Sequence, residues 1–354
     1  MKYSEQNYIK RECKYSYMNL IDCYSKLGWK QNPFTFEILP KTLVGYREQT
    51  EKLKTCLKSG QKVSLILGPT GSGKTTFLKW FSENNPEYDY LFLPKPPREP
   101  EELVGLLNMK YKPFFWSKLD SLYSIPAFLE KKKPLLIICD EAHESNKKVL
   151  EWLRVLADQS DKLYIVFSAL PIFESQLISK LETLRKRIAC KIELISLTKE
   201  ETKELIRKRI EYAGGAGYIP FSNEAMDTIF EQSGGFPREA IRVANILVNR
   251  AAELDKDSIT PEILDRKEES IKISLDEFSD KQKKILETLI QPLTTEEIVE
   301  IVGIENFKSK NHGIREINNI LRRMLELGYV ERKRKNRNFV YSLSPKLQTI
   351  FVKA

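Results

Sequence analysis

An eight-residue segment early in the chain combines glycines, a lysine and hydroxyl side chains in an order that suits phosphate binding. It runs from Gly68 to Thr75, follows the apolar run Val63–Leu67, and leads into a helix-like stretch. Glycines let consecutive backbone N–H groups close around phosphate oxygens, while a lysine reaches the terminal phosphates and a hydroxyl ligates Mg²⁺. We therefore predict a site for ATP or ADP with Mg²⁺, formed by Gly68, Pro69, Thr70, Gly71, Ser72, Gly73, Lys74, Thr75 and Thr76.

A pair of carboxylates follows a second apolar run. Residues Pro134–Cys139 have the composition of a parallel strand buried on both faces, and Asp140 and Glu141 come directly after it. We expect Asp140 to share Mg²⁺ with Thr75, and Glu141 to polarise the water that attacks the triphosphate. For His143 we expect only a cap on the following helix.

Three further residues could respond to the triphosphate from the same part of the chain. Ser168 follows the apolar run Leu163–Phe167, where a hydroxyl could sense the γ-phosphate or hold the lytic water; an ordinary loop serine is the alternative. Arg185 and Arg187 precede a strand expected at 191–194. Either could stabilise the transition state in a neighbouring subunit, unless both are solvent-facing helix charges.

Helical signals dominate the segment 198–270. Thr198 and Glu201 have the spacing of a capping box, and helical periodicity resumes at 222–232. The turn 234–237 then breaks the chain and places Arg238 near the start of another helix. We expect a helical lid in which Arg238 bridges lid and phosphates, with a surface arginine in a turn as the alternative.

Length and composition limit the classes of protein to consider. With 354 residues the chain exceeds the usual size of one core, so we expect two or three domains. It has neither an apolar run of membrane-spanning length nor an apolar signal core at its start, so we expect a cytoplasmic protein without membrane contact. No CxxC pair occurs, so we expect reduced thiols and no metal cage at Cys13, Cys23, Cys56, Cys139 and Cys190.

The positive charge is concentrated at the C-terminal end. The net charge is +9, and residues 306–354 hold twelve Lys/Arg against three Glu, so residues 1–305 balance at zero. A local cationic field of this kind suits a polyanion, most often nucleic acid. A solvated run of charge would be the alternative if this segment lacked structure of its own.

The C-terminal segment reads as a winged-helix domain. We expect an amphipathic helix near 280–290, a second helix opened by the capping box of Thr294 and Glu297, and then a third helix. The third helix has an apolar stripe at Ile314, Ile317, Ile320, Leu321, Met324 and Leu327. Its opposite face is polar and could enter a DNA major groove, with Arg315, Asn318, Asn319 and Arg322.

A basic wing follows the third helix. Residues 329–331 and 339–341 are predicted to pair as short strands, with a positively charged turn between them. Such a turn suits phosphate backbone or minor groove, although winged helices also bind proteins. The predicted DNA contacts in the wing are Arg332, Lys333, Arg334, Lys335 and Arg337.

Taken together, these motifs resemble the AAA+ superfamily, in particular the archaeal replication initiators similar to the origin recognition complex and to Cdc-six-type helicase loaders. The resemblance rests on 68–75, Asp140-Glu141, Ser168 and the Gly-Gly-x-Pro-Arg turn at 234–238, with 43–48 and Asn32-Pro33-Phe34 as a similar lead-in. It implies an α/β P-loop AAA+ core with a parallel sheet at 41–197, after an N-terminal extension at 1–40. A helical lid at 198–270 and a winged-helix domain at 271–354 would follow.

The same resemblance implies a function. We expect an ATP-dependent DNA-binding switch whose hydrolysis is slow and depends on self-association or on another AAA+ subunit, with a replicative helicase as a further partner. The chain departs from the initiators at Ser168, where they usually carry Asn.

Other functional classes stay open. One is an AAA+ partner of a transposition or other mobile-element system, and another is a DNA-binding regulator that holds ATP with little hydrolysis. A translocating superfamily-two helicase is disfavoured because a lid and a winged helix occupy the place of its second RecA-like half.

Overall fold

The computed structural model describes residues 24–114, 118–171, 173–174, 181–263, 278–307, 309–326, 329–335, 338–344 and 347. Contacts within the chain divide it into two units, of which one is Ile38–Ile195 and the other joins residues 1–37 to residues 196–354. Parts of the predicted N-terminal extension and lid, at 1–23 and 264–270, lie outside the described residues.

The unit Ile38–Ile195 contains a five-stranded parallel sheet with the order β2-β3-β4-β1-β5. Its strands are β1 Val63–Leu67, β2 Asp89–Leu93, β3 Leu135–Cys139, β4 Leu163–Ala169 and β5 Ile188–Glu193. All strands run the same way, so their carboxyl ends meet at one edge of the sheet, where ligands bind in open α/β folds. The predicted α/β core with a parallel sheet is thus confirmed.

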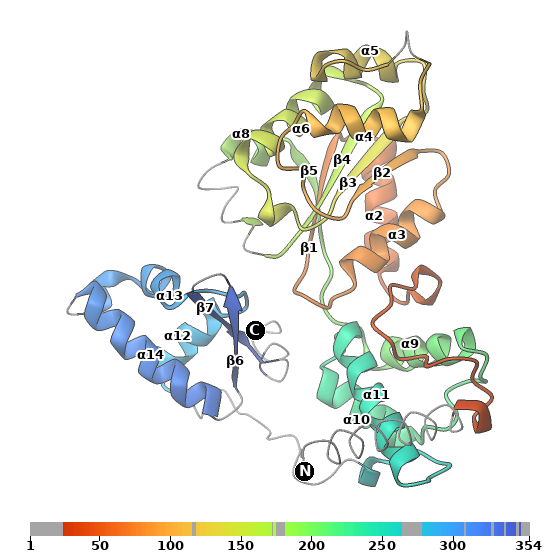
Figure 1. Cartoon of the computed structure of the whole chain (residues 1–354), viewed down its shortest axis with the longest axis vertical. Coiled ribbons are helices and arrows are strands. Elements are labelled where there is room, and N and C mark those ends of the chain that lie inside the picture. Colours follow the sequence, from red (N-terminus) through yellow and green to blue (C-terminus); the bar gives the residue numbers. More distant parts are fainter. Residues whose placement is uncertain are drawn as a thin grey trace, which may run out of the picture. The chain divides into compact units, whose positions relative to one another are not determined.

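Both faces of this sheet are buried at β1 and β3, as the largely apolar sequences of these strands predict. Leu65 and Ile137 join Leu103 of α4 and Leu153 of α6 in one core cluster. Figure 1 shows α2 and α3 on the other side of the sheet from α6 and α8. Among the residues that the structure describes, the α-helices of this unit are α2 Arg47–Lys58, α3 Lys74–Glu83, α4 Glu102–Tyr111, α5 Ile125–Leu129, α6 Lys147–Gln159 and α8 Glu182–Arg185.

The helical part of the other unit comprises α9 Lys199–Tyr212, α10 Asn223–Ser233 and α11 Pro237–Glu253. Thr198 and Glu201 form the predicted capping box, in which the Thr198 side chain accepts from the N–H of Glu201 and the Glu201 side chain accepts from the N–H of Thr198. Gly235 has φ +79°, and a Cβ there would lie 2.1 Å from the carbonyl oxygen of Leu197, so only glycine fits the turn before α11.

The lead-in segment around Asn32-Pro33-Phe34 packs on these helices. Asn32 Nδ2 donates to Asn245 Oδ1 at 2.9 Å, and the Phe34 ring meets that of Phe221 edge to face. The buried Arg209 guanidinium donates to the carbonyl oxygens of Thr35 and Glu37 at 2.9 and 3.0 Å. Residues far apart in sequence therefore fix this segment to the helical part.

The C-terminal segment contains three helices followed by a hairpin: α12 Asp280–Thr288, α13 Thr295–Val302, α14 Lys310–Glu326, β6 Val330–Lys335 and β7 Asn338–Leu343. Ser279 and Thr294 open α12 and α13 with capping boxes. One apolar cluster joins the helices to β7 through Leu286, Ile298, Leu321 and Tyr341.

The prediction that residues 332–337 form the turn of this hairpin was wrong. Strand β6 continues to Lys335, which pairs with Asn338, so only two residues connect the strands. Pairing with β7 keeps the charged residues in the ladder despite their low strand propensity. The strand expected at 191–194 begins three residues earlier than predicted. It is β5, which starts at Ile188 and pairs with β1.

Three of the five cysteines lie in the described part of the chain. Cys56, Cys139 and Cys190 are free and buried, whereas Cys13 and Cys23 lie outside the described residues. In the part of the chain that the structure describes, no helix is both long and apolar enough to span a bilayer.

Candidate functional site

The predicted phosphate loop connects β1 to α3 at the carboxyl edge of the sheet. Gly71 and Gly73 have φ values of 85° and 90°, the left-handed region that favours glycine. This backbone places the loop directly before the first turn of α3, where N–H groups and the helix dipole favour an anion. The geometry fits the phosphates of a nucleotide.

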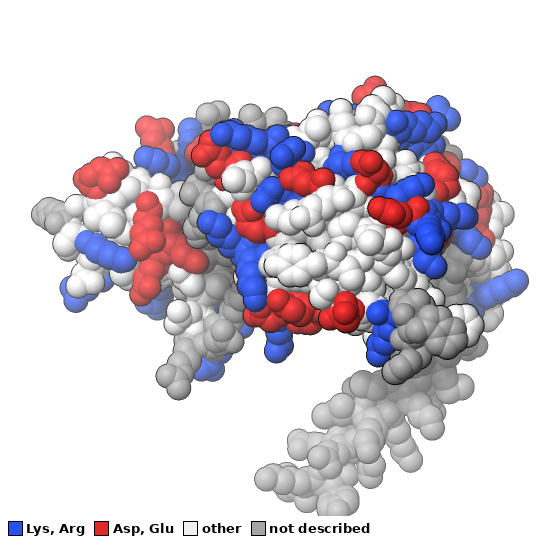
Figure 2. Space-filling model, turned by 90° about the horizontal axis from the view of Figure 1, so that it is seen from above, with Lys and Arg blue, Asp and Glu red and all other residues white. Residues whose placement is uncertain are grey.

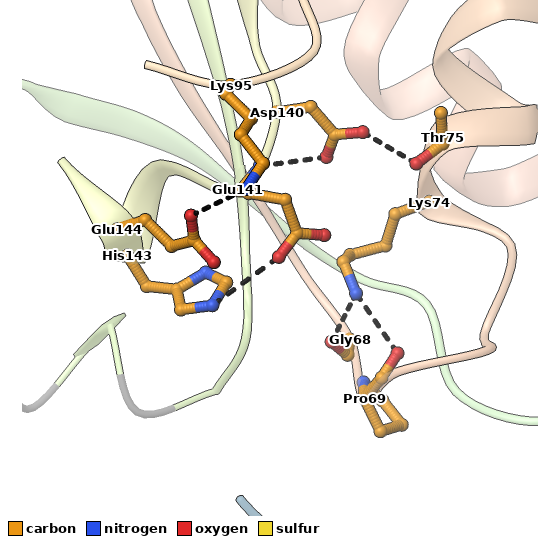
Figure 3. Close-up of polar contacts among 9 residues, drawn as sticks. All are labelled: Gly68, Pro69, Lys74, Thr75, Lys95, Asp140, Glu141, His143 and Glu144. Carbon is orange, nitrogen blue, oxygen red and sulfur yellow. Dashed lines mark hydrogen bonds and ion pairs between the residues drawn. The ribbon is translucent and has the colours of Figure 1, made fainter. Parts of the chain in front are cut away.

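Lys74 and Thr75 begin α3 and face the loop and the end of β3 (Figure 3). The buried Lys74 Nζ donates to the carbonyl oxygens of Gly68 and Pro69 at 2.8 and 3.0 Å. Its ammonium is thus held within the curve of the loop, where it can reach an anion bound there.

A hydroxyl and a carboxylate converge beside the loop, as Mg²⁺ binding requires. Thr75 Oγ1 donates to Asp140 Oδ2 at 2.6 Å, although the two residues are 65 positions apart in sequence. Oxygen ligands of this kind suit Mg²⁺, which usually takes one or two carboxylates together with substrate phosphates. The residues present therefore fit the metal as well as the nucleotide.

Glu141 lies next to this pair on a turn with φ 53°, a left-handed conformation that is uncommon for a non-glycine residue. Burial raises the pKa of Glu141 above its usual range, while the charge of Lys74 opposes this rise. A raised carboxylate pKa suits a general base, because proton transfer is most effective when the pKa is near the working pH.

His143 does not cap the following helix, and this prediction was wrong. Asn146 is the N-cap of α6, where its side chain accepts from the N–H of Val149. The His143 imidazole instead faces back to Glu141, with Nε2 3.4 Å from Glu141 Oε2 (Figure 3). His143 faces Glu141 because it lies in the one-turn 3₁₀ helix Ala142–Glu144, which Glu141 directly precedes.

These residues also form a second group that could hold a cation. Glu141, His143 and Glu144 each offer a ligand atom, and the three atoms lie within 4.8 Å of one another. An imidazole ligand suits transition metals rather than Mg²⁺. The oxygen ligands of Thr75 and Asp140 suit Mg²⁺ better than this group does.

Tyr46 is a contributor to the site that the motifs did not single out. Its hydroxyl donates to the carbonyl oxygen of Ser72 in the loop at 2.7 Å and lies 3.2 Å from that of Ile195. Tyr46 is buried, and its ring meets Phe77 of α3 edge to face. A tyrosine within the lead-in motif 43–48 was the available signal, but its target could not be read from sequence.

Ser168 lies at the expected edge of the sheet. It is the penultimate residue of β4, pairs with Ile66 of β1, and is fully buried. Its hydroxyl has no hydrogen-bond partner among the residues that the structure describes, so it keeps its donor and acceptor capacity for a ligand or water. The sensor role of Ser168 stays a prediction.

The three candidate arginines are all exposed. Arg185 ends α8, and Arg187 lies 3.5 Å from the Asp158 carboxylate. Arg238 begins α11 with its guanidinium 5.7 Å from the centre of the Phe36 ring. Exposure permits contact with a partner or a ligand, and their roles stay predictions.

The predicted nucleic-acid contacts are presented outward. On α14 the side chains of Arg315, Asn318, Asn319 and Arg322 are exposed, while Ile317, Leu321 and Met324 are buried. Asn318 Oδ1 accepts from Thr295 Oγ1 at 2.9 Å. Leu327 lies outside the described residues.

The hairpin carries the other predicted contacts. Arg332, Lys333 and Arg334 are exposed on β6, and the Arg332 guanidinium lies 4.4 Å from the centre of the Phe339 ring. The side chain of Lys335, and Arg337 as a whole, are not described.

Comparison with known proteins agrees with this geometry. Residues 57–177, which contain the loop and the Asp140-Glu141 pair, match the family model described as an AAA domain. The match does not extend to the helical or C-terminal parts of the chain.

Solved structures extend the similarity of the AAA fold over most of the chain. The ORC2 protein of Aeropyrum pernix, in ADPNP-ADP complexes, is 18% identical with a TM-score of 0.56, and the match covers 92% of this chain and 96% of that one. The ORC1 protein of the same organism, in complex with DNA, is 13% identical with a TM-score of 0.51, and the match covers 91% and 97%. At these identities the likeness establishes a P-loop AAA+ fold and nothing more specific.

A sequence relative has a different description. An uncharacterized HTH-type transcriptional regulator of Methanocaldococcus jannaschii is 23% identical over 245 residues, which are 66% of this chain and 58% of the regulator. The matched segment thus spans less than two thirds of the relative's length.

Proposed function

We propose that this AAA chain binds Mg²⁺-ATP, hydrolyses it slowly, and uses the bound nucleotide to control its hold on double-stranded DNA. The observation that carries the proposal is the convergence of Lys74, Thr75, Asp140 and Glu141 at one edge of the sheet. These residues come from two strand ends that are far apart in sequence, so chance proximity is a poor explanation.

Each residue of the site has a defined part in this proposal. The loop 68–75 and Thr76 hold the phosphates, and Lys74 neutralises the terminal ones. Thr75 and Asp140 hold Mg²⁺, which offsets the charge that develops during phosphoryl transfer. Glu141 accepts the proton of the attacking water, while the hydroxyl of Ser168 senses the γ-phosphate.

Hydrolysis that depends on assembly follows from the exposed arginines. Arg185 or Arg187 would supply a positive charge to the γ-phosphate of a neighbouring subunit, either a second copy or another AAA+ chain. Arg238 would contact the phosphates from the helical lid. An isolated chain lacks the charge from its neighbour, so its rate should be low.

The proposed DNA partner rests on the C-terminal part, which we interpret as a winged-helix domain. Positive and negative side chains are interspersed over the face of the molecule shown in Figure 2. A mixed surface of this kind does not select a polyanion, whereas β6 carries Arg332, Lys333, Arg334 and Lys335 in consecutive positions. The exposed face of α14 would enter the major groove, and the hairpin would contact phosphates.

Two biological roles fit these properties. The likeness to the DNA-bound Aeropyrum pernix ORC1 protein favours a replication initiator that recruits a replicative helicase in the cytoplasm. The match to the HTH-type regulator favours control of transcription with little hydrolysis. A third role, as the ATPase partner of a transposition or other mobile-element system, would use the same binding of ATP and DNA.

Sequencing of DNA fragments recovered with the protein would distinguish these roles. We expect enrichment at replication origins if the initiator role is correct. Enrichment at promoters would favour the regulator, and enrichment at mobile-element ends would favour the transposition role. Uniform recovery from the whole genome would contradict a site-directed function of any kind.

A further inference from the structure

The turn that follows Asp140 is held more firmly than an ordinary loop. Asp140 still belongs to the sheet edge, because its N–H donates to the carbonyl oxygen of Leu93 at 2.9 Å. The next turn is closed by the N–H of Glu144, which donates to the carbonyl oxygen of Glu141 at 2.8 Å, and by the full burial of Ala142. The backbone that carries Glu141 and His143 is therefore fixed on both sides.

A second contact ties the turn to the neighbouring strand end. Lys95 follows β2, and its Nζ donates to Glu144 Oε2 at 3.4 Å (Figure 3). This contact is exposed at both partners and adds little stability by itself. It does, however, engage a carboxylate of the same turn that follows Glu141.

His143 and Glu141 form the more enclosed contact. Only 14% of the His143 side chain and 37% of the Glu141 side chain are exposed, and Nε2 and Oε2 are 3.4 Å apart. The chain has one other histidine, His312, which lies 3.7 Å from Glu316 within α14 with 48% of its side chain exposed. Enclosure limits the other positions that the His143 imidazole and the Glu141 carboxylate can adopt. The exposed pair on α14 has no such restriction.

The orientation of the carboxylate follows from this contact. In Figure 3 one oxygen of Glu141 faces the imidazole, and the other is turned to the side where Lys74 lies. Glutamate has several rotatable bonds, so an unheld carboxylate would populate other rotamers at an entropic advantage. The imidazole therefore selects the rotamer that keeps the second oxygen directed to the phosphate loop.

We propose that His143 is a positioning residue for Glu141, which it holds by one oxygen so that the other is free to take the proton of the attacking water. This inference rests on the proposed hydrolysis of ATP, which it deepens. The contact of His143 is with Glu141, which lies outside the phosphate loop. Its effect should therefore fall on the chemical step and leave nucleotide binding unchanged.

The test compares the full-length chain with three variants in steady-state ATP hydrolysis and in equilibrium ATP binding, without DNA. His143→Ala should lower kcat about 10- to 100-fold, the cost of a misplaced catalytic group, while the ATP dissociation constant changes by less than about twofold. His143→Gln places an amide N–H near the position of Nε2 and should recover most of the rate. His312→Ala is the matched control and should behave as the unaltered chain.

The outcomes separate this inference from the proposal on which it rests. An unchanged kcat in His143→Ala would overturn the positioning role while hydrolysis by the unaltered chain stands. A loss of ATP affinity that matches the loss of rate, or a Gln variant as slow as the Ala variant, would show a merely structural role and overturn it too. If the unaltered chain does not hydrolyse ATP, the proposed hydrolysis and the positioning role both fail.

Discussion

The sheet edge and the C-terminal segment differ in how their polar residues are arranged. At the sheet edge, Lys74, Thr75 and Asp140 are held by protein partners at 2.6 to 3.0 Å, and most of their surface is covered. In the C-terminal segment, Arg315, Asn319 and Arg334 point outward from α14 and β6. One region has converging groups, whereas the other has a repeated charge on an outer surface.

The arrangement at the sheet edge suits a chemical reaction, whereas the arrangement in the C-terminal segment suits electrostatic attraction. Converging groups in a covered site are pre-organised, so the loss of one should have a large effect confined to one step. Outward-facing charges of the protein would act together on a duplex. The loss of one or two should therefore lower the affinity for DNA only modestly, by an amount that salt can mask.

Replacement of Glu141 by Gln should have the largest effect. It removes the proposed base but keeps the shape of the side chain, so the hydrolysis rate should fall roughly 1,000-fold. ATP binding should persist because Glu141 is not a part of the loop. Single-turnover hydrolysis and equilibrium titration measure the two properties separately, and an unchanged rate would remove Glu141 from the mechanism.

Replacement of Lys74 by Ala should act on binding itself. Loss of the ammonium removes charge-assisted hydrogen bonds to the terminal phosphates, which should weaken ATP affinity at least about 100-fold. Lys79→Ala on the same helix, where Nζ lies over the Phe92 ring, is the matched control. Equal ATP affinity of the unaltered chain and the Lys74 variant in an equilibrium titration would refute the assignment of the loop.

Removal of positive charge from the hairpin should change the salt dependence of DNA binding. Arg334→Ala together with Lys335→Ala removes two counter-ion-releasing contacts, so the slope of log affinity against log salt should become about 1.8 units shallower. Lys131→Ala together with Lys133→Ala removes the same charge from an exposed loop of the unit Ile38–Ile195. If the hairpin and loop variants give the same slope as the unaltered chain, the hairpin has no part in DNA binding.

Replacement of Tyr46 by Phe should give the smallest effect. Its hydroxyl donates to the Ser72 carbonyl oxygen at 2.7 Å, and the loss of one such hydrogen bond is worth about 1 kcal/mol, or roughly fivefold in ATP affinity. Tyr123→Phe is the control because its ring is exposed. A reduction as large as that of the Lys74 variant would mean that Tyr46 contacts the nucleotide directly.

The parts that sequence could predict are those that local patterns determine. The loop 68–75 and the apolar strand before it could be predicted because strand, turn and helix signals follow one another within about twenty residues. The capping boxes at Thr198 and Thr294 fixed two helix starts for the same reason.

The parts that sequence could not predict depend on pairing over long distances. The contact of His143 with Glu141 requires a 3₁₀ turn that no pattern in 140–146 distinguishes from a helix cap. The extension of β6 through Lys335 depends on its register with β7, and a run of arginine and lysine alone favours a turn. The packing of Asn32 on Asn245 joins residues 213 positions apart.

The most direct test of the account measures duplex binding by the full-length chain with and without Mg²⁺-ATP at one fixed salt concentration. Coupling between two sites is typically worth about 5- to 150-fold in affinity, so we predict at least a fivefold difference that disappears in Lys74→Ala. Identical duplex affinity with and without the nucleotide, under conditions where ATP saturates the chain, would contradict the proposal that the bound nucleotide controls the hold on DNA.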